Sequence, residues 1–356
     1  MSTETNELRS ILGDVVMRLF TDLVTPELRT FAESGQWPSA LWQAVEEGGL
    51  TRPLVPESRG GAGGTWSDAH VVVTAAGRHA VPIPLAETIL ASWLLSEAGL
   101  QVPQGPLTVA PVRRDDALRL EEAEDGWRLS GTASRVPWGA RAQHVVIVSS
   151  VDGRAMIALV ATGHARIDAD RNLALEPRDT LTFDHAPVVA AGPAPEHVPS
   201  SAAMYYGALL RSAQMAGALA WITAQSVQYV TERRQFGKPI GAFQAIQHSL
   251  AVLAGHTAAA DLAAASAFRA ADRGDPGFEI AVAKVRVGEA AGIAASLAHQ
   301  VHGAIGFTYE HALQFYTRRL WSWRAEFGAE SHWSEALGRG ITSLGAHALW
   351  PYVTAR

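Results

Sequence analysis

Residues 229–244 of this 356-residue chain read Tyr-Val-Thr-Glu-Arg-Arg-Gln-Phe-Gly-Lys-Pro-Ile-Gly-Ala-Phe-Gln. The pattern predicts a helix that ends near Arg233, a break across 237–241 and a new helix that begins close to Gln244. A helix amino end carries unpaired N–H groups and a positive dipole, and an arginine presents a rigid fork of donors. This corner of the chain is therefore suited to bind a pyrophosphate.

A second block, residues 300–310, reads Gln-Val-His-Gly-Ala-Ile-Gly-Phe-Thr-Tyr-Glu. Together the two blocks resemble the flavin-binding signature of the acyl-CoA dehydrogenases. The resemblance implies FAD as the cofactor, usually the FAD of a neighbouring subunit in this family. Gly306 is expected to permit a tight turn. The cofactor-binding residues that the resemblance implies are Arg233 at the pyrophosphate, Gln235 and Phe236 at the adenine end, Gln244, Gln300, and Gly303 with Ala304, where the family commonly has two glycines.

The composition narrows the functional classes. Hydrophobic residues make up 48% and charged residues 18%, as expected of a globular protein, and the net charge of −6 gives no electrostatic reason to bind nucleic acid or an anionic membrane. The absence of cysteine excludes disulfides, thiolate metal sites and a cysteine nucleophile. The polar, acidic amino end does not resemble a signal peptide, so we expect a cytoplasmic protein. The apolar stretch 200–224 carries an arginine and is interpreted as a buried bundle helix rather than a membrane span.

The chain divides into three regions by pattern. Residues 1–104 show helical periodicity around an irregular Gly- and Pro-rich loop at 53–64, residues 105–196 show short β-branched runs, and residues 197–356 are long Ala-rich helical stretches. We expect helices near 200–232, 242–273, 277–303, 309–326 and 331–348. This α+β order of helical domain, β domain and helical bundle matches the acyl-CoA dehydrogenase fold.

Two other cofactor classes have no support in the sequence. No Gly-x-Gly-x-x-Gly unit indicates a nicotinamide site, so flavin is expected to be the redox group. His248 and His302 lie close to the flavin blocks but lack the spacing of metal ligands, and we interpret them as packing or cofactor-adjacent residues.

The catalytic base is the weakest part of the resemblance. The resemblance implies removal of an α-proton from an acyl-CoA by a glutamate, which commonly stands in a Tyr-Glu-Gly-Thr turn at a fixed interval after an Arg-Asp pair, a pair that aligns here with Arg318-Arg319. Counting from Arg318 and Arg319 places Phe327 at that position, with Glu326 one residue early. One residue on a helix turns a side chain by about 100°, so Glu326 is either a displaced base or a solvated surface carboxylate. A second position that some members use for the base is occupied here by Gly207.

The middle region departs from the family as well. The Thr-Glu-Pro-x-x-Gly-Ser-Asp strand has no counterpart, and Arg135-Val-Pro-Trp138 replaces a Trp-Ile-Thr-Asn passage. Residues that the fold lends to a neighbour's FAD are present, whereas those that hold its own flavin ring are missing. This asymmetry resembles the degenerate subunit of the heteromeric acyl-CoA dehydrogenases of sterol and cholate side-chain degradation, whose expected substrates are bulky CoA thioesters.

Three hypotheses remain open at this point. The first is an FAD-sharing subunit that pairs with a second acyl-CoA dehydrogenase chain, within a tetramer. The second is a self-sufficient homo-oligomer with Glu326 as its base, and the third is a non-catalytic scaffold subunit. Electron-transferring flavoprotein is a partner by resemblance only.

Overall fold

The structure, a computed structural model, describes residues 3–113 and 115–355. Its first region is helical, as predicted, and the loop at 53–64 contains only the short 3-10 turn Glu57–Arg59. The helix α4 begins where Thr65 accepts a hydrogen bond from the Asp68 N–H and Asp68 accepts one from the Thr65 N–H. The helices of this region are α1 (Thr3–Leu23), α2 (Pro26–Glu33), α3 (Ser39–Glu47), α4 (Trp66–Arg78) and α5 (Leu85–Glu97).

The middle region forms two four-stranded sheets. One has the order β1-β4-β5-β8 and the other β2-β3-β7-β6, and β1 and β4 form the parallel pair among otherwise antiparallel neighbours. Buried residues of both sheets share one apolar cluster, so the sheets enclose a common core. The strands are β1 (Leu107–Ala110), β2 (Ala117–Ala123), β3 (Gly126–Pro137), β4 (His144–Val151), β5 (Arg154–Ala161), β6 (Arg166–Asp168), β7 (Arg178–Pro187) and β8 (Ala190–Pro193).

The last region is the predicted helical bundle. Helix α9 is shorter than the predicted 309–326, because a 3-10 turn at Gly303–Phe307 precedes it and a turn with positive φ at Phe327 and Gly328 follows it. A two-residue hairpin, β9 (Arg234–Gln235) and β10 (Lys238–Pro239), and the 3-10 turn Ile240–Ala242 connect α6 to α7. The helices are α6 (Ala202–Glu232), α7 (Gln244–Arg273), α8 (Gly277–His302), α9 (Leu313–Trp323), α10 (Glu330–Leu344) and α11 (Ala346–Thr354).

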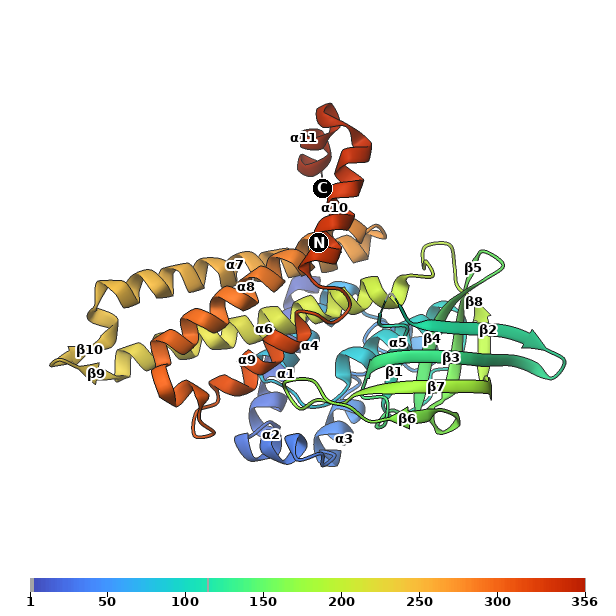
Figure 1. Cartoon of the computed structure of the whole chain (residues 1–356), viewed down its shortest axis with the longest axis horizontal. Helices are drawn as coiled ribbons and strands as arrows, with labels where there is room; N and C mark the ends of the chain where they lie inside the picture. The colour runs from blue at the N-terminus through green and yellow to red at the C-terminus, as the bar shows by residue number, and fades with distance from the viewer. Residues whose placement is uncertain (1–2, 114, 356) are drawn as a thin grey trace.

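Figure 1 shows how these regions are arranged: the strands lie at one end, the β9–β10 hairpin lies at the opposite end of the long helices, and α10 and α11 project from the side. Helices α4 and α6 cross where Gly77 and Gly217 allow backbone contact, since a Cβ at either position would lie 2.0 Å from a carbonyl oxygen of the other helix. The predicted α+β architecture is confirmed. The exact domain boundaries at 104 and 196 stay predictions, within the connections 98–106 and 194–201.

The two apolar segments of the bundle differ in burial. The stretch 200–224 lies almost wholly within α6 and is largely buried, as predicted. By length and composition, α7 is the helix of the described residues that could cross a membrane, and only 22% of its most apolar window is buried.

Candidate functional site

The two sequence blocks meet in space at the hairpin end of the bundle. They line one cavity of about 590 Å³ between the end of α6, the start of α7 and the end of α8. The Tyr229 ring stacks on His302 at 4.5 Å, which ties α6 to α8 beneath the cavity. The structure therefore brings together nearly all predicted cofactor residues: Arg233, Gln235, Phe236, Gln300, Gly303 and Ala304 line it.

Arg233 is the arginine among the residues that line this cavity. Within the described part of the chain, the Arg233 guanidinium has no hydrogen bond or ion pair. The neighbouring cations are occupied, because Arg234 donates to the Gly237 carbonyl at 3.2 Å and the Lys238 ammonium lies 4.3 Å from the centroid of the Phe243 ring. Arg233 is therefore available to an anion from outside the chain.

Backbone groups add to this wall. Among the described residues no side chain caps the amino end of the 30-residue helix α7, so its first N–H groups and the positive end of its dipole stay open beside Phe243 and Ile246, which line the cavity. Gly303 ends α8 with φ of 66°, a conformation that suits glycine, and a Cβ there would meet no atom within 4 Å. The tight turn thus depends on Gly303. Gly306 has no positive φ, but it is buried in the 3-10 turn Gly303–Phe307, where a Cβ would lie 3.0 Å from Leu313, so glycine permits the close packing of this turn.

Two predicted residues lie at the edge of the cavity. Gln244 is the exposed first residue of α7 and is not among the lining residues. Phe236 lines the rim with 90% of its surface exposed and with φ of 49°, which is unusual for a bulky residue. His248 lies outside the lining, whereas His302 is buried in the chain and is itself one of the lining residues.

The predicted base region forms a second site, in the turn after α9. Lys284 of α8 fixes this turn from below, since its ammonium donates to the carbonyls of Arg324 at 2.7 Å, Gly328 at 2.8 Å and Trp323 at 3.4 Å. Burial lowers the pKa of Lys284 to about 7. In this turn, the Glu326 side chain belongs to a network of ion pairs, whereas the Phe327 side chain packs in the apolar core.

Glu326 is held by arginines from two other elements. Arg178 of β7 donates to both of its oxygens, at 2.7 and 3.1 Å, and Arg211 of α6 pairs with it at 2.9 Å. The Asn172 amide donates to it at 3.2 Å, and the Glu326 side chain is only 14% exposed. The interpretation of Glu326 as a solvated surface carboxylate is therefore wrong.

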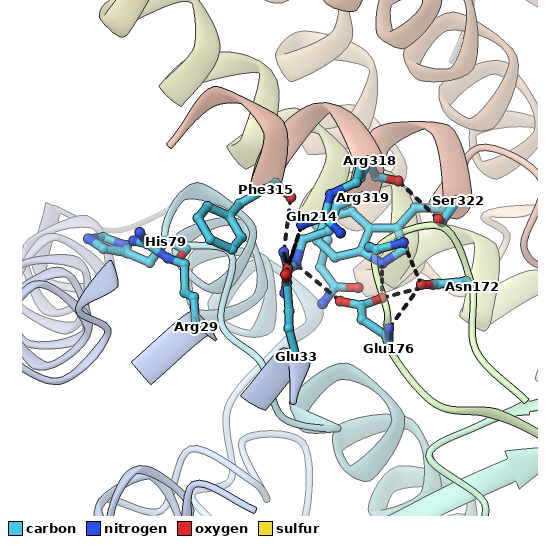
Figure 2. A network of polar contacts seen from close by, with 12 residues as sticks. Arg29, Glu33, His79, Asn172, Glu176, Gln214, Phe315, Arg318, Arg319 and Ser322 are labelled. Carbon is cyan, nitrogen blue, oxygen red and sulfur yellow. Dashed lines mark hydrogen bonds and ion pairs between the residues drawn. The ribbon is translucent and has the colours of Figure 1, made fainter. Parts of the chain in front are cut away.

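These contacts belong to a larger buried network of alternating charge. Arg211 also pairs with Glu87 of α5 at 2.7 Å, and Arg178 pairs with Glu176 at 2.9 Å. Figure 2 shows the adjoining part, in which Glu176 and Glu33 from separate segments approach Arg318 and Arg319 of α9. We call this set the charge network. It contains four acids and four bases: Glu33, Glu87, Glu176, Glu326, Arg178, Arg211, Arg318 and Arg319.

The network keeps its carboxylates ionised. Burial alone would raise the pKa of Glu326, but the charges of Arg178 and Arg211 outweigh it and hold the pKa below its ordinary value. The same balance lowers the pKa of Glu176 to about 2, where the opposing charges include Arg178 and Arg319. A general base near neutrality needs a pKa close to the working pH and a free lone pair facing its substrate. Glu326 is far from both conditions.

The Phe327 ring fills the space between α5 and α6 next to Gly207. A Cβ at Gly207 would lie 2.3 Å from two carbons of the Phe327 ring, so the two positions at which the family resemblance places a base are here in mutual contact. Around them, between α5 and α6, a cavity of only about 10 Å³ is left, about the size of one water probe. On the opposite side, Phe327 and Glu326 border a cavity of about 290 Å³ that reaches Val112 and Arg135 of the β region.

Sequence reasoning missed most of the charge network. Glu87, Glu176, Arg178 and Arg211 stand in unrelated segments, and no local spacing marks them as partners. A weak signal was available in Arg211, a charged residue within an otherwise apolar helix, because a buried charge requires a partner.

Comparison with known proteins identifies the family of this chain. Residues 6–101 match the family "Acyl-CoA dehydrogenase, N-terminal domain" and residues 199–340 match "Acyl-CoA dehydrogenase, C-terminal domain". Acyl-CoA dehydrogenase IpdE2 of Mycobacterium tuberculosis is 30% identical over 88% of this chain and 91% of its own length. The chain belongs to the acyl-CoA dehydrogenase family. Members of this family bind FAD and oxidise the CH–CH bond of acyl-CoA thioesters.

One further sequence match and one structural match support this result. Acyl-CoA dehydrogenase FadE34 of Mycobacterium tuberculosis is 32% identical over 85% of this chain, which spans only 42% of that longer protein. A crystal structure of the ChsE4-ChsE5 complex from Mycobacterium tuberculosis has a TM-score of 0.87 and 23% identity, and covers 97% of this chain and 99% of its own. This last likeness establishes the fold.

Proposed function

We propose that this chain is the FAD-sharing subunit of a heteromeric acyl-CoA dehydrogenase. The observation that carries the proposal is the contrast between the two sites. The cavity at the hairpin end retains an unpaired arginine, an uncapped helix end and a glycine turn, whereas Phe327 and Gly207 fill the position of the base. Such a chain offers one half of a flavin site and leaves proton abstraction to its partner.

The residues of the first cavity fit the pyrophosphate and adenosine parts of FAD. Arg233 would pair with the pyrophosphate, and the N–H groups at the start of α7 would add donors. Gln300 and the backbone at Gly303 and Ala304 would form the opposite wall, with Gln235 and Phe236 at the adenine end. Bound FAD supplies the acceptor for the hydride that leaves the β-carbon of the acyl group. Glu326 has a structural role in this proposal.

Substrate, partners and location follow by resemblance. The substrate is a bulky acyl-CoA thioester of sterol-type side-chain degradation, and the partner is a second acyl-CoA dehydrogenase chain in a tetramer. The solved relative is named as a complex of two unlike chains, ChsE4 and ChsE5, which supports a heteromer. Electron-transferring flavoprotein is the proposed acceptor, and the location is cytoplasmic.

The decisive experiment compares two adjacent arginines in the co-expressed complex. Arg233→Ala removes a charge-assisted contact worth about 2 kcal/mol, so FAD affinity falls by roughly thirtyfold. Arg234→Ala is the matched control, since Arg234 is exposed but bonded to the Gly237 carbonyl. Affinity is measured by flavin fluorescence during titration of the apo-complex.

The alternatives give different results in the same assays. A chain that purifies alone as a yellow homotetramer and oxidises acyl-CoA would support the self-sufficient enzyme and overturn the proposal. Full FAD affinity in Arg233→Ala would instead support a scaffold that contributes no cofactor contact.

A further inference from the structure

The cavity of about 290 Å³ beside the turn after α9 is separate from the proposed FAD cavity. Among the described residues, none lines both cavities. Its walls come mainly from β3, from the loop between β6 and β7, and from α9 with the turn that follows it. Small-molecule sites have volumes of roughly 300 to 1,000 Å³, so this cavity suits a small ligand. We call it the Arg135 cavity, and its lining includes Arg113, Arg135, Leu173, Trp321 and Phe327.

The Arg135 cavity offers positive charge at its opening. The lining carboxylate, Glu326, is neutralised within the chain, because Arg178 and Arg211 pair with it at 2.7 and 2.9 Å. Arg113 and Arg135 are exposed, and the carboxylates that pair with them are exposed as well. Exposed pairs contribute less than about 1 kcal/mol, so a ligand anion can replace those partners. The cavity therefore favours a negatively charged ligand.

The other polar side chains of the lining are already bonded within the chain. The Asn172 amide donates to Glu176 at 3.1 Å and to Glu326 at 3.2 Å, and its oxygen accepts two backbone N–H groups. Ser322 donates to a carbonyl of its own helix at 2.9 Å. Pro137 has no N–H to offer. A ligand thus meets two guanidinium groups, one hydroxyl oxygen and otherwise apolar side chains.

The apolar part of the lining suits a ring. Trp321 and Leu173 are large side chains that stay exposed, at 46% and 67%, beside the cavity. Phe327 is buried and forms the inner wall. Aromatic faces pack against a second ring in offset or edge-to-face geometry. A rigid ring system would therefore cover the exposed indole of Trp321.

Backbone strain is concentrated around the Arg135 cavity. Arg135 and Phe327 have φ of 57° and 52°, and Leu175, in the loop that also carries Leu173, has φ of 60°. Such conformations cost about 1 to 3 kcal/mol each, and they cluster at ligand sites. The pairing of β3 with β7 also shifts register at Arg135, and bulges of this kind re-aim a side chain. The strained conformation of Arg135 is explained if its guanidinium serves a ligand.

We infer that the Arg135 cavity binds a small amphipathic carboxylate, an organic acid with one carboxylate on a rigid ring body. The carboxylate pairs with Arg113 and Arg135 in place of their exposed partners. The ring lies against Trp321, Leu173 and Phe327, and the ligand joins the β region to the turn after α9. This site does not depend on the proposed sharing of FAD.

A flavin ring and an acyl-CoA thioester are the competing occupants. A flavin ring presents donors as well as acceptors along its polar edge, and the lining side chains offer one free acceptor, the Ser322 hydroxyl. The acyl end of a thioester is neutral and brings no charge to Arg113 and Arg135. A carboxylate fits these residues better than either.

The test is calorimetric titration of the chain with 2-naphthoate and with its neutral counterpart, 2-naphthamide. We expect 2-naphthoate to bind, and 2-naphthamide to bind about tenfold to a hundredfold more weakly, because the amide loses the charge-assisted contacts. Arg135→Gln should weaken 2-naphthoate by a similar factor. Arg119→Gln is the matched control, since Arg119 forms an exposed pair on β2, and it should leave the affinity unchanged.

A second variant tests the strain. Glycine adopts positive φ freely, so Arg135→Gly should lose 2-naphthoate binding while the melting temperature does not fall. A lower melting temperature would mean that Arg135 stabilises the fold, and would overturn this explanation of its backbone.

Other results overturn the site itself. These are equal binding of 2-naphthoate and 2-naphthamide, unchanged affinity in Arg135→Gln, or tighter binding of riboflavin or coenzyme A than of 2-naphthoate, since the cavity would then be a remnant of a flavin or thioester site. FAD affinity of the co-expressed complex should be unchanged in Arg135→Gln; a loss like that expected for Arg233→Ala would assign the cavity to the flavin site. Full FAD affinity in Arg233→Ala would refute cofactor sharing and leave 2-naphthoate binding intact.

Discussion

Replacement of Glu326 by Gln separates a structural carboxylate from a catalytic one. The substitution keeps the shape of the side chain but removes one negative charge from the charge network. It also places an amide N–H₂ group, which is a donor, against the donor groups of Arg178 or Arg211. Removing one partner from a buried ion pair costs about 3 to 5 kcal/mol. Arg178 and Arg211 each keep another carboxylate, Glu176 and Glu87, so we expect the lower end, about 3 kcal/mol.

A loss of this size is measurable by thermal unfolding. At roughly 2 °C per kcal/mol for a chain of this length, the melting temperature should fall by about 6 °C in differential scanning fluorimetry at pH 7. Glu121→Gln is the control, since Glu121 forms an exposed pair with Arg119 and exposed pairs contribute less than about 1 kcal/mol.

The refuting result is equally definite. If Glu326→Gln leaves the melting temperature unchanged while turnover of the complex disappears and FAD stays bound, Glu326 is the base and the structural reasoning fails. The expected pattern is the reverse, with lower stability and retained turnover per folded complex.

Other expected outcomes concern the turn after α9 and the buried acids. Gly207→Ala should destabilise the chain by about 1 to 3 kcal/mol through overpacking, because the added methyl group would clash with the Phe327 ring. The double variant with Phe327→Ala should relieve that clash, and urea unfolding of the single and double variants checks both expectations. Lys284→Met removes the ammonium donor of the Arg324 and Gly328 carbonyls and should lower the urea midpoint more strongly than an exposed Lys or Arg substitution. Because folding lowers the pKa values of Glu176 and Glu326, the stabilisation from both is present above about pH 4.5 and is lost as the pH falls through their folded pKa values, which for Glu176 is about 2. Acid titration followed by tryptophan fluorescence would detect this loss.

The parts of the structure that sequence reasoning predicted are those encoded locally. Each flavin block specifies a helix end followed by a turn within a few residues: one block contains Arg233 and the glycines after it, and the other contains Gln300 and Gly303. The two blocks line one cavity once the helical bundle has formed. The order of helical and strand regions is also local, because each region carries its own period of apolar residues.

The second site could not be predicted in the same way. Phe327 and Gly207 were recognised separately as departures from the family, but their contact joins positions 120 residues apart. The partners of Glu326 likewise come from β7 and α6, and each side chain alone is compatible with a surface position. Only tertiary packing shows that Phe327, Gly207 and the buried arginines belong to one filled site.

The charge network also constrains how this chain is made. Its contacts span most of the chain, since Glu33 pairs with Arg318 across 285 residues and Arg178 with Glu326 across 148. During synthesis, the buried arginines of the earlier segments have no complete set of partners until the segment near residue 326 leaves the ribosome. Long-range contacts of this kind slow folding and prolong the exposure of partly assembled states. A nascent chain shortened before α9 should therefore depend on chaperones, whereas the 356-residue chain should unfold as a single cooperative unit.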